Sequence, residues 1–240
     1  HIIPLLNKYK VTAYICGHSH NYERSELPGG VTQIISGGAG APPHRKMTTA
    51  AQQNPYSKIF ASELHFCLFE IADGTARVKV LTPQGLQAGG VKLAHLTGVD
   101  AVELTAEQWA AIHVWLLTGG TLIVDQAGGP RGDLEKSFDS AFRQAIERRY
   151  GPTALKKVSA GNELLTGLDK VGYRHFLGRR RASMPPRLES VKIGGRDAII
   201  YSRYDMTCGL LGCPNPMVSG LTERGAYRVL ARLVKRIAGP

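Results

Sequence analysis

The chain has 240 residues, of which 43% are hydrophobic and 20% charged, with a formal net charge of +11. This composition excludes a disordered or fibrous protein, and the length suits one large domain or two smaller ones. No apolar run reaches the ~18 residues that a membrane span needs, so we expect no membrane-spanning segment. The positive charge is spread along the chain without interleaved aromatic residues, and nucleic acid therefore ranks last among the partners considered.

Residues 1–85 have the pattern of short strands separated by glycine-rich loops. The runs VTAYIC and VTQIIS, at 11–16 and 31–36, are rich in β-branched residues and end in turn-formers. The segments HFCLFEI and ARVKVL, at 65–71 and 76–81, flank the hairpin dipeptide Asp73-Gly74. Pro and Gly then interrupt the pattern, and we expect a linker over residues 86–95.

Residues 96–240 are predicted to form a second domain of alternating helices and strands. A capping box of Thr105 and Gln108 should start one helix, and TLIVD at 121–125 has the pattern of a buried strand. A second helix is expected within residues 133–150, with Leu134 on its apolar face, and Gly151 should stop it.

The rest of this domain is predicted to contain one more strand and a closing helix. Residues 152–187 are expected to be mainly loop, and DAIIYS at 197–202 has the pattern of a strand. TERGAYRVLARLVKRIAGP should form the last helix, with a solvated outer stripe of Arg224, Arg228 and Arg232. This order favours a layered α/β domain with a mainly parallel sheet.

Two histidines follow the first predicted strand, in the motif Gly17-His18-Ser19-His20. Gly17 lets the backbone turn, and imidazoles two residues apart can then face a shared space. Imidazole suits transition metals, so His18 and His20 are candidate metal ligands. Surface histidines in a loop are common, and the motif by itself does not decide between these interpretations.

The order VTAYICGHSHNYERS, GGVTQIISGGAGAP and FCLFEIADGTARVKVL resembles the C-terminal part of calcineurin-like metallophosphoesterases, closest to purple acid phosphatases. The resemblance implies a β-rich remnant of that family's sandwich over residues 1–85. It also implies that His18 and His20 each ligate one ion of a dinuclear Fe, Zn or Mn centre that hydrolyses a phosphoester substrate. Arg24 could contact the substrate phosphate, or it could pair with Glu23 or Glu26.

The other motifs that this family needs, Asp-X-His among them, do not occur in these 240 residues. We therefore expect a truncated phosphoesterase that is inactive by itself, because two imidazoles without a bridging carboxylate hold ions weakly. A signal for an extracytoplasmic location of the parent protein would precede residue 1. His44 and His65 match no ligand position and are interpreted as a loop residue and a strand-edge residue.

Residues 91–239 resemble a bacterial family known only as a domain of unknown function, number forty-one fifty-nine, which is similar to class I glutamine amidotransferases. The marks of the resemblance are Leu104-Thr105, Gly119-Gly120, Asp125, Gly195-Arg196, Tyr201-Ser202 and Asp205. It implies a three-layer α/β sandwich of flavodoxin type. Glutaminase activity is not implied, because Cys208 and Cys213 lie in no Gly-X-Cys-X-Gly elbow.

Asp125 and Asp205 both follow predicted strands, where ligands of open α/β sheets bind. With Arg196 and Arg203 they form a candidate pocket, although helix capping or a turn role is the more ordinary use of each aspartate. The second hypothesis for the whole chain is accordingly a non-catalytic module that binds a ligand or partner. Cys208 and Cys213 could also form a disulfide in an oxidising compartment.

Overall fold

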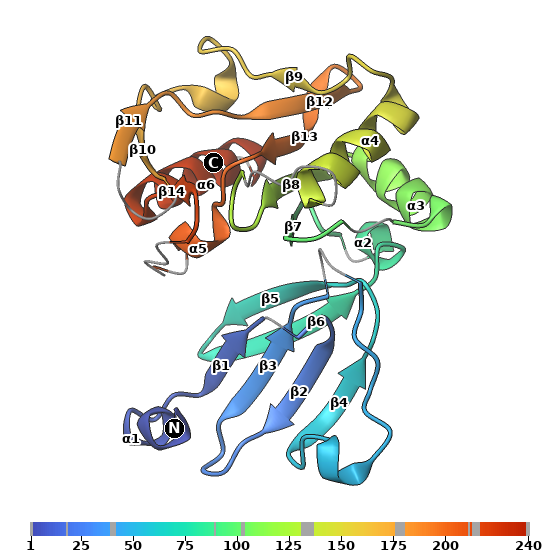
Figure 1. Cartoon of the computed structure of the whole chain (residues 1–240), viewed down its shortest axis with the longest axis vertical. Coiled ribbons are helices and arrows are strands. Elements are labelled where there is room, and N and C mark those ends of the chain that lie inside the picture. The colour runs from blue at the N-terminus through green and yellow to red at the C-terminus, as the bar shows by residue number, and fades with distance from the viewer. Residues whose placement is uncertain are drawn as a thin grey trace. The chain divides into compact units, whose positions relative to one another are not determined.

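The computed structural model describes residues 2–17, 19–38, 42–88, 90–101, 104–130, 137–175, 181–210, 212 and 217–238. The chain forms two compact units, residues 1–85 and residues 86–240, which we call the first and second unit (Figure 1). Helices and several sheets occur together, so the predicted α/β fold class is confirmed.

The first unit is built on a four-stranded sheet with the order β1-β3-β2-β4. β1 runs parallel to β3, and β2 is antiparallel to both β3 and β4. A separate two-stranded sheet consists of β5 and β6. The elements are α1 (Ile3–Lys8), β1 (Ala13–Cys16), β2 (Tyr22–Glu26), β3 (Thr32–Ser36), a 3-10 helix (Ala50–Gln52), β4 (Ser57–Ala61), β5 (Phe66–Ala72) and β6 (Thr75–Leu81).

The hairpin predicted around Asp73-Gly74 is confirmed, with β5 and β6 paired from Phe66↔Leu81 to Ala72↔Thr75. Both turn residues have positive φ, 50° at Asp73 and 71° at Gly74, as a tight turn between twisted strands requires. The sequence did not predict β2 and β4. Their alternation is hidden, because β2 carries the polar run YERSE and buries Glu23 and Ser25.

The second unit is built on a five-stranded sheet with the order β7-β8-β13-β12-β9. The first three strands are parallel, whereas β12 is antiparallel to both of its neighbours. The sheet is therefore mixed, and the predicted parallel arrangement holds only for its first three strands. Their bounds are β7 (Leu93–Gly98), β8 (Thr121–Gln126), β13 (Arg196–Ser202), β12 (Glu189–Ile193) and β9 (Lys156–Lys157).

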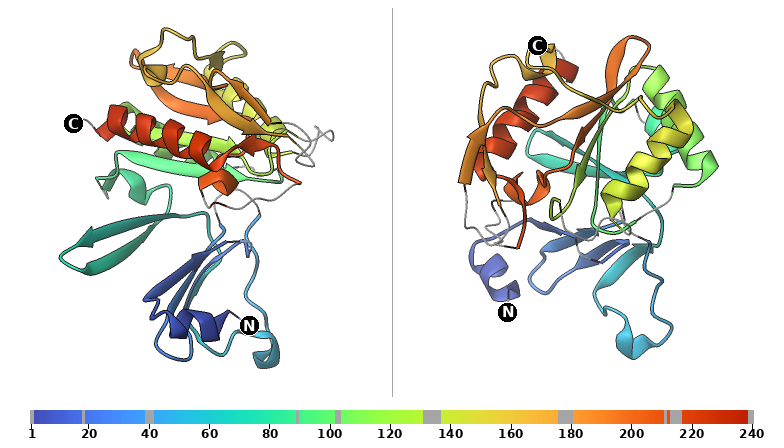
Figure 2. Two further views of the ribbon diagram at one scale, coloured as in Figure 1. Left: turned by 90° about the vertical axis from the view of Figure 1, so that its left-hand side faces the viewer. Right: turned by 45° about the horizontal axis from the view of Figure 1, so that its top comes forward.

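Helices cover both faces of this sheet, which gives the unit three layers (Figure 2). α3 (Ala106–Leu117) and α4 (Phe138–Tyr150) lie on one face, where the rings of Phe142 and Tyr201 approach to 4.8 Å. α5 (Thr207–Leu210) and α6 (Glu223–Ala238) lie on the other, where Ile123 and Ile200 share a buried cluster with Val229. A small sheet of β11 (Arg181–Met184), β10 (Val171–Arg174) and β14 (Gly220–Leu221) adjoins α6.

Local sequence motifs correctly predicted where one helix of the second unit begins and where another ends. The capping box of Thr105 and Gln108 is present, and Gly151 ends α4 with φ 94°. β8 is buried along its whole length, as predicted for TLIVD. α4 begins after the N-cap Ser137, and the prediction for Leu134 lies outside the described residues.

Three stretches differ from expectation because long-range contacts fix them. The predicted linker contains the start of β7, and the short helix α2 (Gly85–Ala88) places Leu86 with no exposed surface. Residues 152–187 contain strands β9, β10 and β11 and a 3-10 helix (Glu163–Leu165) rather than loop alone. The outer arginines of α6 are not merely solvated, since Arg228 donates to the carbonyl of Lys170 and Arg232 to that of Glu163.

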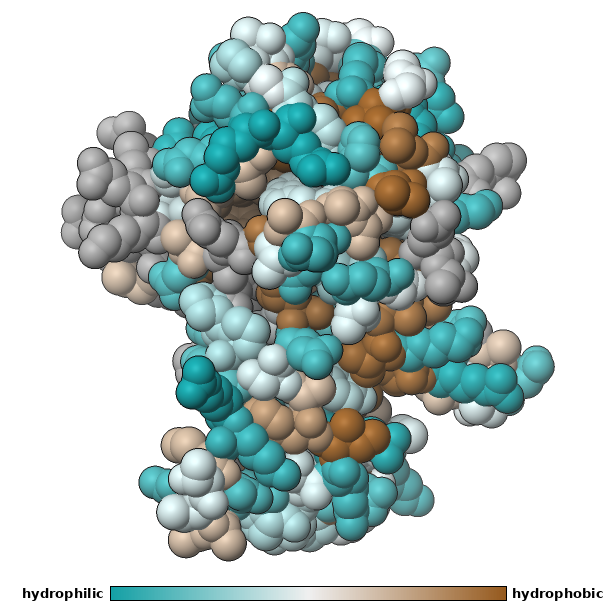
Figure 3. Space-filling view, turned by 90° about the vertical axis from the view of Figure 1, so that its right-hand side faces the viewer, coloured by the Kyte–Doolittle hydropathy of each residue, from teal (hydrophilic) through white to brown (hydrophobic). Residues whose placement is uncertain are grey.

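Apolar residues also occur on the surface, where Figure 3 shows them as patches between hydrophilic ones. Phe69 and Val80 of the hairpin are 37% and 38% exposed, and Val114 and Leu117 of α3 are 43% and 59% exposed. The helix α3 nevertheless buries Trp115, whose indole N–H donates to the carbonyl of Val91 at 2.6 Å.

A methyl group at Gly120 would test how tightly this end of α3 packs. A Cβ there would lie 2.1 Å from Cε2 of Trp115, whose ring the Val91 bond holds in place. We expect Gly120→Ala to lower the free energy of unfolding by about 1–3 kcal/mol, as overpacking does. Urea unfolding followed by tryptophan fluorescence measures this, because both tryptophans lie in α3.

Gly161→Ala is the matched control in the same unit, since a Cβ at Gly161 would meet nothing within 4 Å. Its free energy of unfolding should change by less than about 0.5 kcal/mol or rise slightly. Equal losses in the two variants would contradict the close contact between Gly120 and Trp115.

Candidate functional site

The loop after β1 positions His20 through two backbone contacts and one ring contact. His18 lies outside the described residues. His20 Nδ1 lies 3.1 Å from the carbonyl oxygen of Pro42. The amide of His20 donates to Nδ1 of His44 at 3.2 Å, and the two imidazoles stack with centroids 4.2 Å apart.

These contacts assign different tautomers to the two rings. A carbonyl can only accept, so His20 Nδ1 carries the proton and Nε2 keeps its lone pair. His44 Nδ1 accepts the amide of His20, so a neutral His44 has its proton on Nε2. His20 can therefore bind a metal ion through Nε2, whereas His44 is arranged as a hydrogen-bond donor.

The other polar residues near this loop have separate partners. His65 directly precedes β5 and is buried: it is 3% exposed, with Nε2 3.0 Å from Ser36 Oγ and Nδ1 2.8 Å from the carbonyl oxygen of Glu63. Arg24 is exposed, and the described ion pairs join Glu26 to Lys58 instead. In the part of the chain that the structure describes, no three His, Cys, Asp or Glu side chains gather as a metal site.

In the second unit, Asp125 near the end of β8 is the centre of a hydrogen-bonded cluster. The side chain has no exposed surface. Its Oδ1 lies 2.7 Å from Nε2 of His95, in the neighbouring strand β7. Its Oδ2 accepts from the amide of Met206 at 2.7 Å and from that of Thr207 at 3.2 Å. Asp125 thus ties β7 and β8 to the start of α5.

Asp205 is the second buried carboxylate at this carboxyl edge of the sheet. It has no exposed surface, and its Oδ1 accepts from the amide of Cys208 at 2.7 Å. Its Oδ2 accepts from the amide of Gly128, in the turn that follows β8. Both aspartates therefore accept hydrogen bonds from backbone amides, which is the turn or capping role that the sequence favoured for them.

His95 is the member of this cluster that reaches solvent, with a side chain 32% exposed. Burial by itself would lower the pKa of His95. The hydrogen bond to Asp125 and the negative charges of Asp125 and Asp205 outweigh that effect and raise the pKa. The protonated imidazole is therefore favoured at this edge.

The pKa values of the two carboxylates shift in opposite directions. Burial would raise the pKa of Asp125, but the positive charge of His95, their hydrogen bond and the amides of Met206 and Thr207 lower it. Burial raises the pKa of Asp205, and the nearby charge of Asp125 raises it further, against the hydrogen bonds from Gly128 and Cys208. Folding therefore shifts both partners toward their charged forms, a carboxylate at Asp125 and an imidazolium at His95.

The structure brings only two members of the predicted four-residue pocket together. Arg196 begins β13 and donates to the carbonyls of Leu116 and Gly120, at the opposite edge of the sheet. Arg203 pairs with Asp139 Oδ2 at 3.0 Å, on the face covered by α4. The predicted Cys208–Cys213 disulfide involves Cys213, which lies outside the described residues.

Sequence reasoning missed His95, although a signal was available. The run LAHLTG alternates along β7 between half-buried and buried positions, and His95 occupies a half-buried one. In the parallel pairing of β7 with β8, Thr97 lies opposite Asp125. His95 lies two residues before Thr97, so its side chain is on the same face of the sheet as those of Thr97 and Asp125. A strand recognised at 93–98 would have placed His95 beside Asp125.

The second unit is thus a three-layer α/β domain in which His95 of β7 pairs with a buried carboxylate, Asp125, near the carboxyl end of β8. Residues 77–231, more than half of the chain, match the family described as a domain of unknown function (DUF4159). The chain belongs to this family. No curated protein matches it. None of the helices described is both long and apolar enough to cross a membrane.

The His95–Asp125 pair predicts a pH dependence of stability. Because the pKa of His95 is raised by folding, its protonation stabilises the fold below the unfolded pKa of about 6.5, and this contribution is lost as pH rises through the folded pKa. The advantage of the native protein over His95→Gln in free energy of unfolding should therefore be largest below about pH 6.5 and fall as the pH rises above it. Urea unfolding at several pH values, followed by tryptophan fluorescence, measures this.

His113→Gln is the control with the opposite sign. Burial and the charge of Arg149 lower the pKa of His113, so its protonation opposes folding as pH falls. The difference in free energy of unfolding between the native protein and His113→Gln should instead shrink as the pH falls. If the free energies of unfolding of the two variants depended on pH in the same way, the result would count against the His95–Asp125 pair.

Proposed function

We propose that residues 1–85 correspond to the C-terminal part of a calcineurin-like metallophosphoesterase domain, of the purple acid phosphatase type. In it His18 and His20 would each bind one ion of an iron, zinc or manganese pair. The observation that carries this proposal is the contact between His20 Nδ1 and the carbonyl of Pro42. Metal-binding histidines usually donate their other ring N–H in this way, which orients the ring and leaves Nε2 for the ion.

The ligand set of this chain limits what it can do alone. When bound, such ions supply Lewis-acid activation of a phosphoester and of the water that attacks it. Two imidazoles provide no carboxylate to bridge the pair, and the 240 residues contain no Asp-X-His sequence. We therefore propose that this chain binds a single ion weakly and does not hydrolyse phosphoesters without further ligands.

A zinc titration by calorimetry of chelator-treated protein tests this proposal. We expect one weakly bound ion, with affinity at least ~10-fold lower in His18→Ala and in His20→Ala. His44→Gln should bind almost as well as the native chain, because His44 Nδ1 is already used by the amide of His20.

Activity gives the second half of this test. With zinc, manganese or iron added, the chain should not hydrolyse p-nitrophenyl phosphate above background. Turnover that disappears in His18→Ala would disprove the expected inactivity. Loss of zinc binding in His44→Gln but not in His20→Ala would disprove the ligand assignment.

A second candidate function concerns the second unit, and His95 favours it. We propose that this unit is an amidotransferase-like domain that binds a ligand or partner without catalysing glutamine hydrolysis. Its support is a partly exposed imidazole whose pKa is raised by a buried carboxylate, that of Asp125, which lies near the strand ends where open α/β sheets bind ligands. Cys208 lies within the four-residue helix α5 rather than on an elbow that directly follows a strand.

A charged imidazole in this position predicts binding of small anions. At pH 6, acetate or inorganic phosphate should raise the melting temperature of the native chain, because a ligand that binds only the folded state stabilises it. The shift should be lost in His95→Gln and kept in His113→Gln. Tryptophan fluorescence measures the melting temperature. Equal shifts of the melting temperature in the native protein and in His95→Gln would contradict a binding role for His95.

A further inference from the structure

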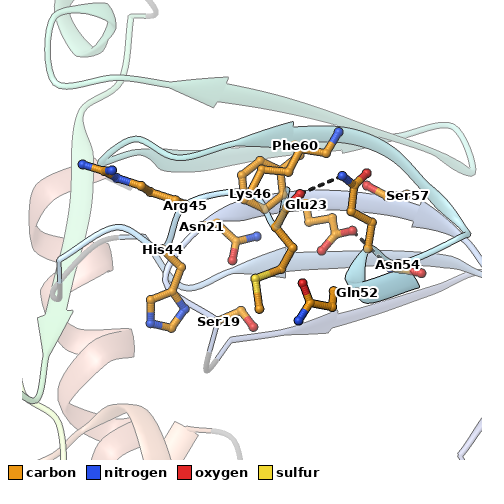
Figure 4. Close-up of a pocket in the computed structure, with 12 residues that line it drawn as sticks. Ser19, Asn21, Glu23, His44, Arg45, Lys46, Gln52, Asn54, Ser57 and Phe60 are labelled. Carbon is orange, nitrogen blue, oxygen red and sulfur yellow. Dashed lines mark hydrogen bonds between the residues drawn. The ribbon is translucent and has the colours of Figure 1, made fainter. Parts of the chain in front are cut away.

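A polar pocket of about 530 Å³ lies in the first unit (Figure 4). Successive residues of β2 point to opposite faces of the sheet, so Glu23 and Ser25 share one face while Arg24 and Glu26 lie on the other. The pocket lies on the face of Glu23, under the long segment that joins β3 to β4. It is lined by Ser19, Asn21, Glu23, His44, Arg45, Lys46, Met47, Gln52, Gln53, Asn54, Ser57 and Phe60.

Asn21 places an unused hydrogen-bond donor in this pocket. Its side chain is 3% exposed, and its Nδ2 has no hydrogen-bond partner in the part of the chain that the structure describes. The backbone holds the residue in place, since its amide donates to Ser19 and its carbonyl accepts from Gly37. A buried amide donor without an acceptor destabilises a fold, so a ligand that supplies an acceptor would gain from this position.

Glu23 places an acceptor beside that donor. Its side chain is buried, and Oε1 accepts from Nδ2 of Asn54 at 3.2 Å. A carboxylate offers about four acceptor positions, so this bond leaves capacity for a ligand. No ion pair involving Glu23 occurs among the described residues. Figure 4 shows the side chains of Asn21, Glu23 and Gln52 extending into the same space.

We propose that this pocket binds a small polyhydroxylated molecule of the monosaccharide or cyclic polyol class. A hydroxyl group donates and accepts at once, so neighbouring hydroxyls can accept from Asn21 Nδ2 and donate to the Glu23 carboxylate. Phe60 and Met47 supply apolar surface for the C–H face of such a ring. The volume of the pocket lies within the usual range for sites of small ligands.

Other ligand chemistries match only half of this arrangement. An anion would accept from Asn21 but would be repelled by Glu23, and an ammonium ion would pair with Glu23 but leave Asn21 without an acceptor. The cations Arg45 and Lys46 also line the pocket, but both residues are exposed, and Arg45 extends away from the other labelled side chains (Figure 4). Binding needs no metal ion, which separates this proposal from the metal-binding role of His20.

Saturation-transfer NMR on the whole chain, with a chelator present, tests the proposal. The probes are glucose, galactose, mannose and myo-inositol, with acetate and methylammonium for the two single-charge alternatives. We expect at least one polyol to bind, and to bind about tenfold more weakly to Asn21→Leu and to Glu23→Gln, as the loss of a buried hydrogen bond predicts. The result is independent of metal binding, so it can fail while the metal proposal stands.

Glu26→Gln is the matched control, because Glu26 lies on the same strand with its side chain 60% exposed and paired with Lys58. It should leave polyol binding unchanged. The proposal is overturned if no polyol binds, if binding survives in Glu23→Gln, or if acetate or methylammonium binds more tightly than every polyol.

Stability separates a binding role of Asn21 from a structural one. Because its Nδ2 has no partner, Asn21→Leu should not lower the melting temperature measured by circular dichroism without ligand. A marked fall would assign Asn21 to the folding of the loop. In that case Glu23→Gln, which keeps the shape of the side chain, decides whether the pocket binds polyols.

Discussion

The second unit depends on one buried carboxylate, that of Asp125. Moving an ionised carboxylate into a protein interior costs several kcal/mol unless charges and hydrogen bonds offset it. Here the offset comes from two separate parts of the chain, because His95 lies in β7 and the amides of Met206 and Thr207 lie at the start of α5. The same bonds that keep Asp125 ionised therefore fix where α5 starts relative to the sheet.

The two units rely on different interactions in their interiors. The second unit has wholly buried apolar side chains on both faces of its sheet, such as Leu122, Ile123, Ile199 and Ile200. The described buried apolar residues of the first unit are few, whereas Asn21, Glu23, Ser25 and His65 are buried there too. Buried polar groups need partners, so the first unit is specified largely by hydrogen bonds. The Nδ2 atom of Asn21 has no partner among the described residues, and Asn21 is for that reason the residue that marks the pocket.

Local signals were sufficient for some elements of the fold. Asp73-Gly74 adopts the positive φ angles that its residue types favour, and Thr105 with Gln108 closes its capping box within four residues. β2 could not be found in the same way, because YERSE is a strand only through its neighbours β3 and β4. Apart from Tyr22, the buried positions of that strand are polar, so neither hydrophobicity nor alternation identified it.

The candidate sites show the same division between local and long-range information. Asp125 and Asp205 could be placed at one edge, since Asp125 lies near the carboxyl end of β8 and Asp205 follows β13, its parallel partner. Arg196 could have been excluded from that edge by the same argument, because it begins β13 while Asp205 follows its end. The other site residues depend on long-range contacts. His95 lies 30 positions from Asp125, and His20 lies 24 positions from His44. The pocket at Asn21 depends on the contact of Glu23 with Asn54, 31 positions away. The contact of His95 could have followed from recognising the strand at 93–98, whereas the other two contacts follow only from the fold.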